Sequence, residues 1–245
     1  MKDTRLIMGM PVTVEVVGSD SPDALEHAFE YFTEVDERFS TYKPESEISR
    51  FNRGELSDAE LSDDMRAVFA LAERTKEETD GYFDMHHPDG SIDPSGIVKS
   101  WAILNAANRM PTGASYCIDI GGDIASAGTN EEGRPWSIGI RNPFNRDEIV
   151  KAIVPNGKGV ATSGSYIRGA HIYDPHEPER TLEEIVSLTV IGPDVLEADR
   201  FATAAFVMGR SGIEFIEARP ELEGYSIDKD GIATMTSGFL PYISA

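Results

Sequence analysis

The sequence contains an acid and a hydroxyl whose spacing suits a metal ion beside a phosphate group. Asp199 and Thr203 are four residues apart in a run with the pattern of a helix, so both lie on one helical face. That face is otherwise apolar, because it also carries Leu196, Phe206 and Val207. An acid on an apolar stripe needs a partner if it is buried, and a hard cation bound to one carboxylate and one hydroxyl oxygen would supply it. Magnesium is the usual cation beside phosphates.

The same spacing also fits a purely structural role. Asp199 would then pair with Arg200 or another base, and the Thr203 hydroxyl would donate a hydrogen bond to the carbonyl oxygen of Asp199. The spacing by itself leaves both roles open.

Any ligand that carries phosphate must overcome the charge of this chain. Of 245 residues, 22 are Lys or Arg and 43 are Asp or Glu, so the net charge is −21. Such a chain repels a nucleic-acid backbone or an anionic bilayer, and we expect neither as a partner. A phosphate pocket would need a local cation or helix N-termini. Lys99, in a helix predicted from Ser95 (as N-cap) to Arg109, could hold an anion with the free amides there, or could be a solvated surface residue.

Two glycine-containing segments and one histidine give weaker signals. The run 157–165 has the composition of a phosphate cradle, but a glycine follows Lys158, so it is no P-loop. Gly121-Gly122-Asp123 lacks the spacing of a dinucleotide fingerprint, and both segments can be ordinary turns. His171 follows the first segment, so a strand could place its ring beside that loop, whereas His86-His87 is expected in solvent. No catalytic triad or zinc pattern follows from these spacings.

Hydrophobic periodicity, capping residues and turn signals predict the elements that must position these side chains. A strand and three helices come first, short strands begin after Ser115, and a further helix and a hairpin close the chain. We therefore expect one α+β domain over residues 1–245, with a central β-rich layer flanked by helices. The expected helices are 21–38, 63 to about 81, 95–109 and 194–208, and the expected strands are 12–16, 118–120, 136–140, 149–154, 186–191, 225–227 and 232–235.

Cysteine usage and hydropathy limit the environment of the chain. Cys117 is the single cysteine, so no internal disulfide can form, and its apolar neighbours favour a small buried hydrophobic residue. No run approaches the ~18–20 apolar residues of a membrane helix, and the first residues lack the apolar stretch of a secretory signal. We expect no membrane insertion and a cytoplasmic location.

Taken in order, several segments resemble blocks of the FAD:protein FMN transferases, the ApbE-type family first named as thiamine-biosynthesis lipoproteins. The resemblance is collective, because each block is short but together they run along nearly the whole chain. The blocks are Met8-Gly9, Phe39 to Glu47, Thr79 to Asp84, Asp93 to Lys99, Gly121 to Asp123, Thr162 to Tyr166, His171 to Pro175 and Glu197 to Thr203.

The resemblance implies an α+β fold that binds FAD in a cleft, with magnesium at the pyrophosphate. A Ser or Thr hydroxyl of an acceptor flavoprotein would attack the FMN-side phosphorus of FAD, AMP would leave, and the acceptor would be flavinylated. By position, His171 would be the base that removes the hydroxyl proton, and Asp199, Thr203 and the backbone oxygen of Gly96 would hold the metal. The FAD site would be lined by Met8, Tyr42, Tyr82, Phe83, Asp84, Asp93, Lys99 and His171.

The chain departs from the usual family pattern, and two rival functions fit the same residues. It has no lipoprotein signal or acylatable N-terminal cysteine, its segment between Asp84 and Asp93 is very short, and His176-Glu177-Pro178 stands where Arg-Thr-Gly is usual. An FAD pyrophosphatase would use water in place of the protein hydroxyl. A non-catalytic flavin-binding module would not need Asp199 and Thr203 together.

Overall fold

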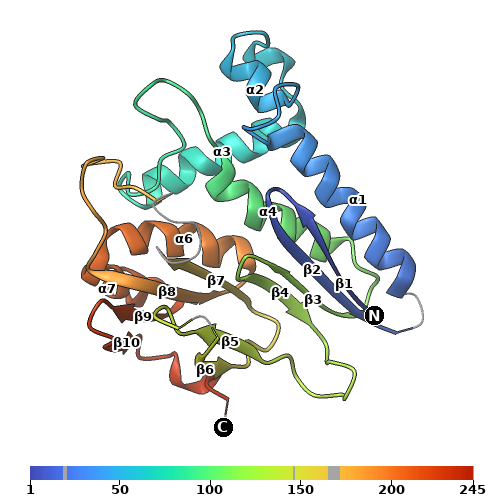
Figure 1. Ribbon diagram of the computed structural model, residues 1–245, viewed down its shortest axis with the longest axis vertical. Coiled ribbons are helices and arrows are strands. Elements are labelled where there is room, and N and C mark those ends of the chain that lie inside the picture. The colour runs from blue at the N-terminus through green and yellow to red at the C-terminus, as the bar shows by residue number, and fades with distance from the viewer. Residues whose placement is uncertain (19–20, 146, 165–171, 245) are drawn as a thin grey trace.

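The computed structural model describes residues 1–18, 21–145, 147–164 and 172–244, and a sheet of eight strands lies at the centre of this part of the chain (Figure 1). The strand order is β1-β2-β3-β4-β7-β8-β9-β10, and neighbouring strands are antiparallel. A second sheet contains β5 and β6. The bounds are β1 Lys2–Ile7, β2 Met10–Val17, β3 Ser115–Ile120, β4 Asp123–Ala127, β5 Ile138–Arg141, β6 Ile149–Ile153, β7 Gly159–Gly164, β8 Ile185–Gly192, β9 Glu223–Asp228 and β10 Ala233–Met235.

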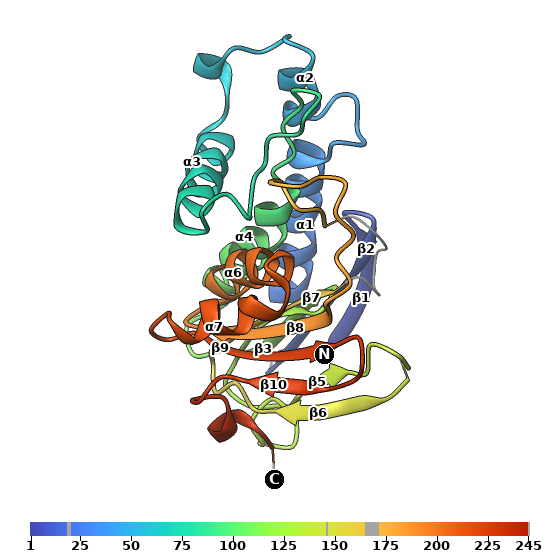
Figure 2. The same ribbon diagram turned by 90° about the vertical axis from the view of Figure 1, so that its left-hand side faces the viewer.

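The helices gather on one face of the large sheet, and the small sheet lies against the other face (Figure 2). Among them, α1, α4 and α6 pack directly on strands, whereas α3 packs on α4 farther from the sheet. This arrangement confirms the expected α+β class, with helices concentrated on a single side. The bounds are α1 Ser21–Phe39, α2 Glu47–Asn52, α3 Asp63–Glu78, α4 Ser95–Asn108, α6 Val195–Val207 and α7 Gly212–Glu217, with short 3-10 turns at Asp58–Glu60, Gly209–Ser211 and Leu240–Tyr242.

Apolar side chains at every second position of β2 and β3 form the core beneath the helices. Val12 and Val14 pair in register with Ile120 and Ile118, and all four side chains are fully buried. They belong to one apolar cluster with Phe32 of α1. Because successive strand residues point to opposite faces, the residues between them point away from the helices.

A second core fills the space between the two sheets. Ile138 of β5 and Ile153 of β6 are buried there against Ile191 of β8 and Tyr225 of β9. Phe239, which follows β10, completes this cluster and is fully buried. The large sheet is therefore covered on both faces over its second half, which explains why β8 is apolar with little alternation.

Helix starts follow the capping signals at α3 and α6 but not at α4. The Ser62 side chain accepts a hydrogen bond from the Met65 backbone, and Asp194 accepts one from the Glu197 backbone. The expected cap at Ser95 is wrong, since Ser95 is already the first residue of α4. Asp93 accepts the Ser95 N–H instead, at 2.9 Å, because an Asp side chain readily closes a turn two residues ahead.

The remaining element predictions succeed where the pattern is strong. The expected closing hairpin is formed by β9 and β10. The structure adds β1, α2, β4 and β7, which the sequence pattern did not indicate. The run 157–165 is therefore not only a loop, because residues 159–164 form β7 in the middle of the large sheet.

No helix in the described ranges is both long enough and apolar enough to cross a bilayer. The expected cytoplasmic location stays a prediction.

Candidate active site

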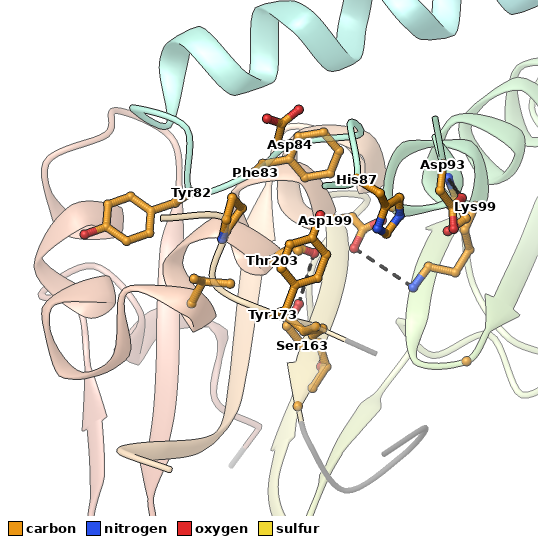
Figure 3. Close-up of a pocket in the computed structure, with 18 residues that line it drawn as sticks. Tyr82, Phe83, Asp84, His87, Asp93, Lys99, Ser163, Tyr173, Asp199 and Thr203 are labelled. Atoms are coloured by element: carbon orange, nitrogen blue, oxygen red, sulfur yellow. Dashed lines mark hydrogen bonds and ion pairs between the residues drawn. The ribbon is translucent and has the colours of Figure 1, made fainter. Parts of the chain in front are cut away.

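A pocket opens where four parts of the chain meet: the connection between α3 and α4, the beginning of α4, the end of β7, and α6 (Figure 3). The described residues after position 171 also contribute to its wall through Ile172, Tyr173 and Pro175. The fold thus assembles in one place segments that are far apart in the sequence. Eight of the expected site residues line this pocket: Tyr82, Phe83, Asp84, Asp93, Gly96, Lys99, Asp199 and Thr203.

Asp199 is a buried acid that its own helix does not neutralise. It is 3% exposed, and its Oδ2 atom is buried without a hydrogen-bond partner among the described residues. Its Oδ1 atom lies 4.0 Å from the ammonium nitrogen of Lys99. The Thr203 hydroxyl, one turn further along α6, lies 3.3 Å from the hydroxyl of Ser163 on β7.

The alternative pairing of Asp199 with Arg200 is wrong. The Arg200 guanidinium points to the other side of α6, where it binds the carboxylates of Glu197 and Glu78. Successive helix residues are separated by about 100° around the axis, so neighbours such as Asp199 and Arg200 do not share a face.

Lys99 is held between two acids. Its ammonium forms an ion pair with Asp123, the first residue of β4, and also faces Asp199. The Lys99 side chain is 15% exposed, so the expectation of a solvated surface residue is wrong. Asp123 is fully buried and also accepts the backbone N–H of Thr162 at 3.3 Å. Burial raises the pKa of Asp123, the nearby Asp199 raises it further, and Lys99 acts in the opposite direction.

The opposite wall of the pocket is aromatic. Phe83 packs on Gly96 at the start of α4, where a Cβ atom would lie 2.9 Å from the ring, so only glycine fits without moving it. Tyr82 stacks on His176 with ring centroids 4.6 Å apart. The ring of Tyr173 lies 5.5 Å from that of His87.

Two acids that also line the pocket, Asp84 and Asp93, have hydrogen-bond partners of their own. Asp84 forms an ion pair with Lys76 at 2.7 Å and accepts the backbone N–H of His86 at 2.9 Å. Partial burial acts to raise the pKa of Asp84, but these hydrogen bonds outweigh it and the pKa lies below its ordinary value. Asp93 is held by its hydrogen bond from the backbone of Ser95.

Three expected residues are not part of this described pocket wall. Met8 lies in the turn between β1 and β2 and packs at the edge of the helix-side core. Tyr42, in the connection between α1 and α2, is 95% exposed. His171 lies outside the described residues, so its predicted role is not tested by the structure.

Sequence reasoning missed several lining residues because their partners come from other elements. His87 was expected in solvent, but it is half-buried against Tyr173, which only the folded chain places beside it. Ser163 looked like part of a turn and is a strand residue facing α6. Asp123, which pairs with the lining residue Lys99, was named only as the end of the Gly121 to Asp123 segment and not as a partner of Lys99.

The residues present fit a hard cation of the kind that the sequence suggests. The described chain contains no group of three or more His, Cys, Asp or Glu side chains arranged for a metal. A cation here would take hydroxyl or backbone oxygens in addition to carboxylate, and Asp199, Thr203 and Gly96 offer such a donor set. The Oδ2 atom of Asp199, which has no hydrogen-bond partner among the described residues, is the observation that favours such a ligand.

The fold described above, an antiparallel sheet with helices gathered on one face, matches the folds of ApbE proteins of known structure. The chain superposes on the ApbE protein of Thermotoga maritima with a TM-score of 0.89 at 20% identity, covering 100% of this chain and 99% of that one. It superposes on the flavin transferase ApbE of Vibrio cholerae with a TM-score of 0.85 at 25% identity, covering 99% and 98%.

The ApbE family model matches residues 8–89 and 85–226, and the chain belongs to this family. A relative from Salmonella typhimurium, named FAD:protein FMN transferase, is 29% identical over 290 aligned positions that cover 91% of this chain and 83% of the relative. A relative of the same name from Escherichia coli K12 is 35% identical over 161 positions, covering 61% of this chain and 46% of the relative. These findings confirm the resemblance seen in the sequence.

Proposed function

We propose that the protein is an FAD:protein FMN transferase in which the whole chain, residues 1–245, acts as one catalytic domain. It transfers the FMN half of FAD to a Ser or Thr hydroxyl of an acceptor flavoprotein and releases AMP. Relatives that have this name, and that align with the chain over most of their own length, support the activity. The observation from the site itself is the buried Asp199 oxygen that has no hydrogen-bond partner among the described residues, in a pocket that Thr203 and aromatic side chains also line.

Three oxygen donors would hold Mg²⁺ in this pocket: the Asp199 carboxylate, the Thr203 hydroxyl and the Gly96 carbonyl. When bound, the cation would neutralise negative charge on the pyrophosphate during transfer. Lys99 faces the same region, but Asp123 and Asp199 already share its charge. The cation would therefore supply positive charge that this acidic pocket otherwise lacks.

Tyr82, Phe83, Asp84 and Asp93 would bind the remainder of FAD, because they line the same pocket. The roles of Met8 and Tyr42 as FAD contacts rest on the family resemblance. So does the role of His171 as the base that removes the acceptor proton. A general base of this type accelerates proton transfer by typically ~10²–10⁴-fold.

Intact-mass measurement tests this function directly. The protein is incubated with FAD, Mg²⁺ and candidate flavoproteins encoded in the same genome, and each flavoprotein is weighed before and after. The expected result is a gain of one FMN on an acceptor, matched by AMP in solution. Release of FMN and AMP without any mass gain would instead identify an FAD pyrophosphatase, and FAD binding without turnover would identify a non-catalytic flavin-binding protein.

A further inference from the structure

Arg200 is a buried arginine that joins α6, which lines the pocket, to α3, whose end leads into the pocket-lining segment at Tyr82. It is 1% exposed, and it follows Asp199 directly on α6. Its guanidinium donates two hydrogen bonds of 2.8 Å to Glu197 on the same helix. It also binds the carboxylate of Glu78 and lies 3.4 Å from the hydroxyl of Thr75, both in the last turn of α3. Arg200 therefore ties the end of α3 to α6.

A second arginine fixes the same point of α3. Arg219, just after α7, donates a hydrogen bond of 2.8 Å to the backbone carbonyl of Glu78. Its guanidinium also stacks on Phe215, 3.3 Å from the ring centroid. A cation at the C-terminal end of a helix is favoured by the exposed carbonyl groups there. Glu78, the last residue of α3, is thus held through its side chain by Arg200 and through its backbone carbonyl by Arg219.

The end of α3 determines where the aromatic wall of the pocket lies. The chain turns immediately after Glu78, with Asp80 and Gly81 in the left-handed region at φ values of 50° and 81°. Thr79 is fully buried and fastens the turn, because its hydroxyl donates to the Thr75 carbonyl at 2.7 Å and accepts the Phe83 N–H at 3.2 Å. The next residues line the pocket. Displacing the last turn of α3 would displace them with it.

We propose that Arg200 is a positioning residue that sets the spacing between the two walls of the FAD pocket. One wall is the segment Tyr82 to Asp84, which follows α3, and the other is the Asp199–Thr203 face of α6. A buried ion pair contributes little net stability compared with apolar side chains of similar volume, but it fixes the direction and distance of its partners. This inference rests on the proposed function, because it concerns how FAD spans the pocket.

Fixed spacing matters to a ligand that reaches both walls at once. When two halves of a molecule bind two correctly spaced sites, the second half binds with a high effective concentration that a wrong spacing removes. FAD contains two such parts, because its rings would lie on the Tyr82–Asp84 wall and its pyrophosphate at the cation on α6. Riboflavin and inorganic pyrophosphate each carry one of these parts alone and need no such alignment. Loss of the Arg200 contacts to α3 should therefore weaken FAD binding while leaving the binding of riboflavin and pyrophosphate nearly unchanged.

Two matched substitutions distinguish the contact between α3 and α6 from a general effect of removing one charge. Glu78→Gln breaks the contact between α3 and α6, whereas Glu197→Gln removes the same charge from a partner that lies on the same helix as Arg200. Glu78 and Glu197 are similarly exposed, with 34% and 33% of the side chain in contact with solvent. Arg200→Met and Arg200→Lys complete the set, and thermal melts show which variants are folded.

Calorimetric titration with FAD, riboflavin and inorganic pyrophosphate, each with Mg²⁺, measures the three affinities. We expect Glu78→Gln and Arg200→Met to weaken FAD by roughly 10-fold and riboflavin and pyrophosphate by less than about 2-fold, with Arg200→Lys between them and the wild type. Glu197→Gln should bind all three ligands as the wild type does. Unchanged FAD affinity in folded Glu78→Gln overturns this inference and leaves the proposed function intact. An equal loss for FAD, riboflavin and pyrophosphate overturns it as well, because it indicates general disruption of the pocket. A wild-type protein that does not bind FAD overturns the proposed function as well.

Discussion

At the scale of single residues, Asp199 is a buried acid that the described residues leave incompletely paired. Lys99 is shared between Asp199 and Asp123, and the second oxygen of Asp199 has no hydrogen-bond partner among the described residues. A buried carboxylate in this state destabilises the folded chain. A cation that binds here should therefore stabilise the protein against unfolding, and the effect should depend on Asp199.

Mg²⁺ is expected to raise the melting temperature of the wild type but not of Asp199→Asn. A ligand at 100 times its dissociation constant stabilises the folded state by about 2.7 kcal/mol, so the shift is measurable. Without Mg²⁺, Asp199→Asn should melt at or above the wild-type temperature, because a buried charge has been removed. Thermal melts with and without Mg²⁺ provide the test, with the exposed acid Asp58 replaced by Asn as the control. Equal Mg²⁺ shifts in all three proteins would contradict the metal site.

Cys117 should be unreactive in the folded protein. It lies on β3, half-buried and not fully buried as expected, and burial raises the pKa of its thiol to about 12, with Asp119 and Glu15 acting in the same direction. The thiolate is the reactive form, so at pH 8 almost none is present. A chromogenic disulfide reagent should label Cys117 slowly in buffer and rapidly in urea. Rapid labelling of the folded protein would show that the thiol is exposed.

The sequence could predict the chemistry of residues that share one element, but not the pairs that join elements. Asp199 and Thr203 were found together because helical spacing alone places them on one face. The Lys99–Asp123 pair joins α4 to β4, and the Glu78–Arg200 pair joins α3 to α6. Nothing in a local pattern specifies such partners, because tertiary packing decides them. For this reason the sequence could not decide whether Arg200 pairs with Asp199, and the structure shows that it pairs with Glu197 and Glu78.

At the scale of elements, prediction succeeded where periodicity and caps were strong and failed for strands made of small residues. The four long helices were expected within a few residues of their bounds. β7 was not, because Gly, Ser and Thr in a row are more typical of turns. β7 consists of small residues because α6 packs directly on it and leaves little room for larger side chains. The same close approach brings Ser163 beside Thr203.

Gly159→Ala should separate β7 from α6. A Cβ atom at Gly159 would fall inside van der Waals contact of the Val195 backbone nitrogen, and backbone cannot move aside as a side chain can. We expect a loss of about 2–3 kcal/mol in the free energy of unfolding. In the control, Gly224→Ala, the new methyl group would meet only the side chains of Ile213 and Ile216, so the loss should be smaller. Urea denaturation measures both, and equal losses would refute the close approach.

At the scale of the whole molecule, charge sets the conditions under which the pocket can work. The net charge is −21, and of the described residues that line the pocket Lys99 is the single Lys or Arg, against Asp84, Asp93 and Asp199. The composition predicted this repulsion between the acidic chain and a phosphate ligand, but it could not locate the positive groups that would offset it. The structure places the candidate groups at α4 and α6, while the long-range field of the protein still opposes FAD.

Salt should therefore strengthen FAD binding, which is the reverse of its usual effect on phosphate ligands. Repulsion between exposed charges is screened as the Debye length falls from about 30 Å at 0.01 M to about 8 Å at 0.15 M ionic strength. With Mg²⁺ kept saturating, so that screening does not empty the cation site, we expect FAD affinity to rise roughly 2–5-fold over this range. Fluorescence titration at several NaCl concentrations gives the affinities, and riboflavin, which has no phosphate, is the control that should not respond. If FAD affinity instead falls steeply with salt while riboflavin stays constant, local positive charge at Lys99 and the cation outweighs the field of the whole chain.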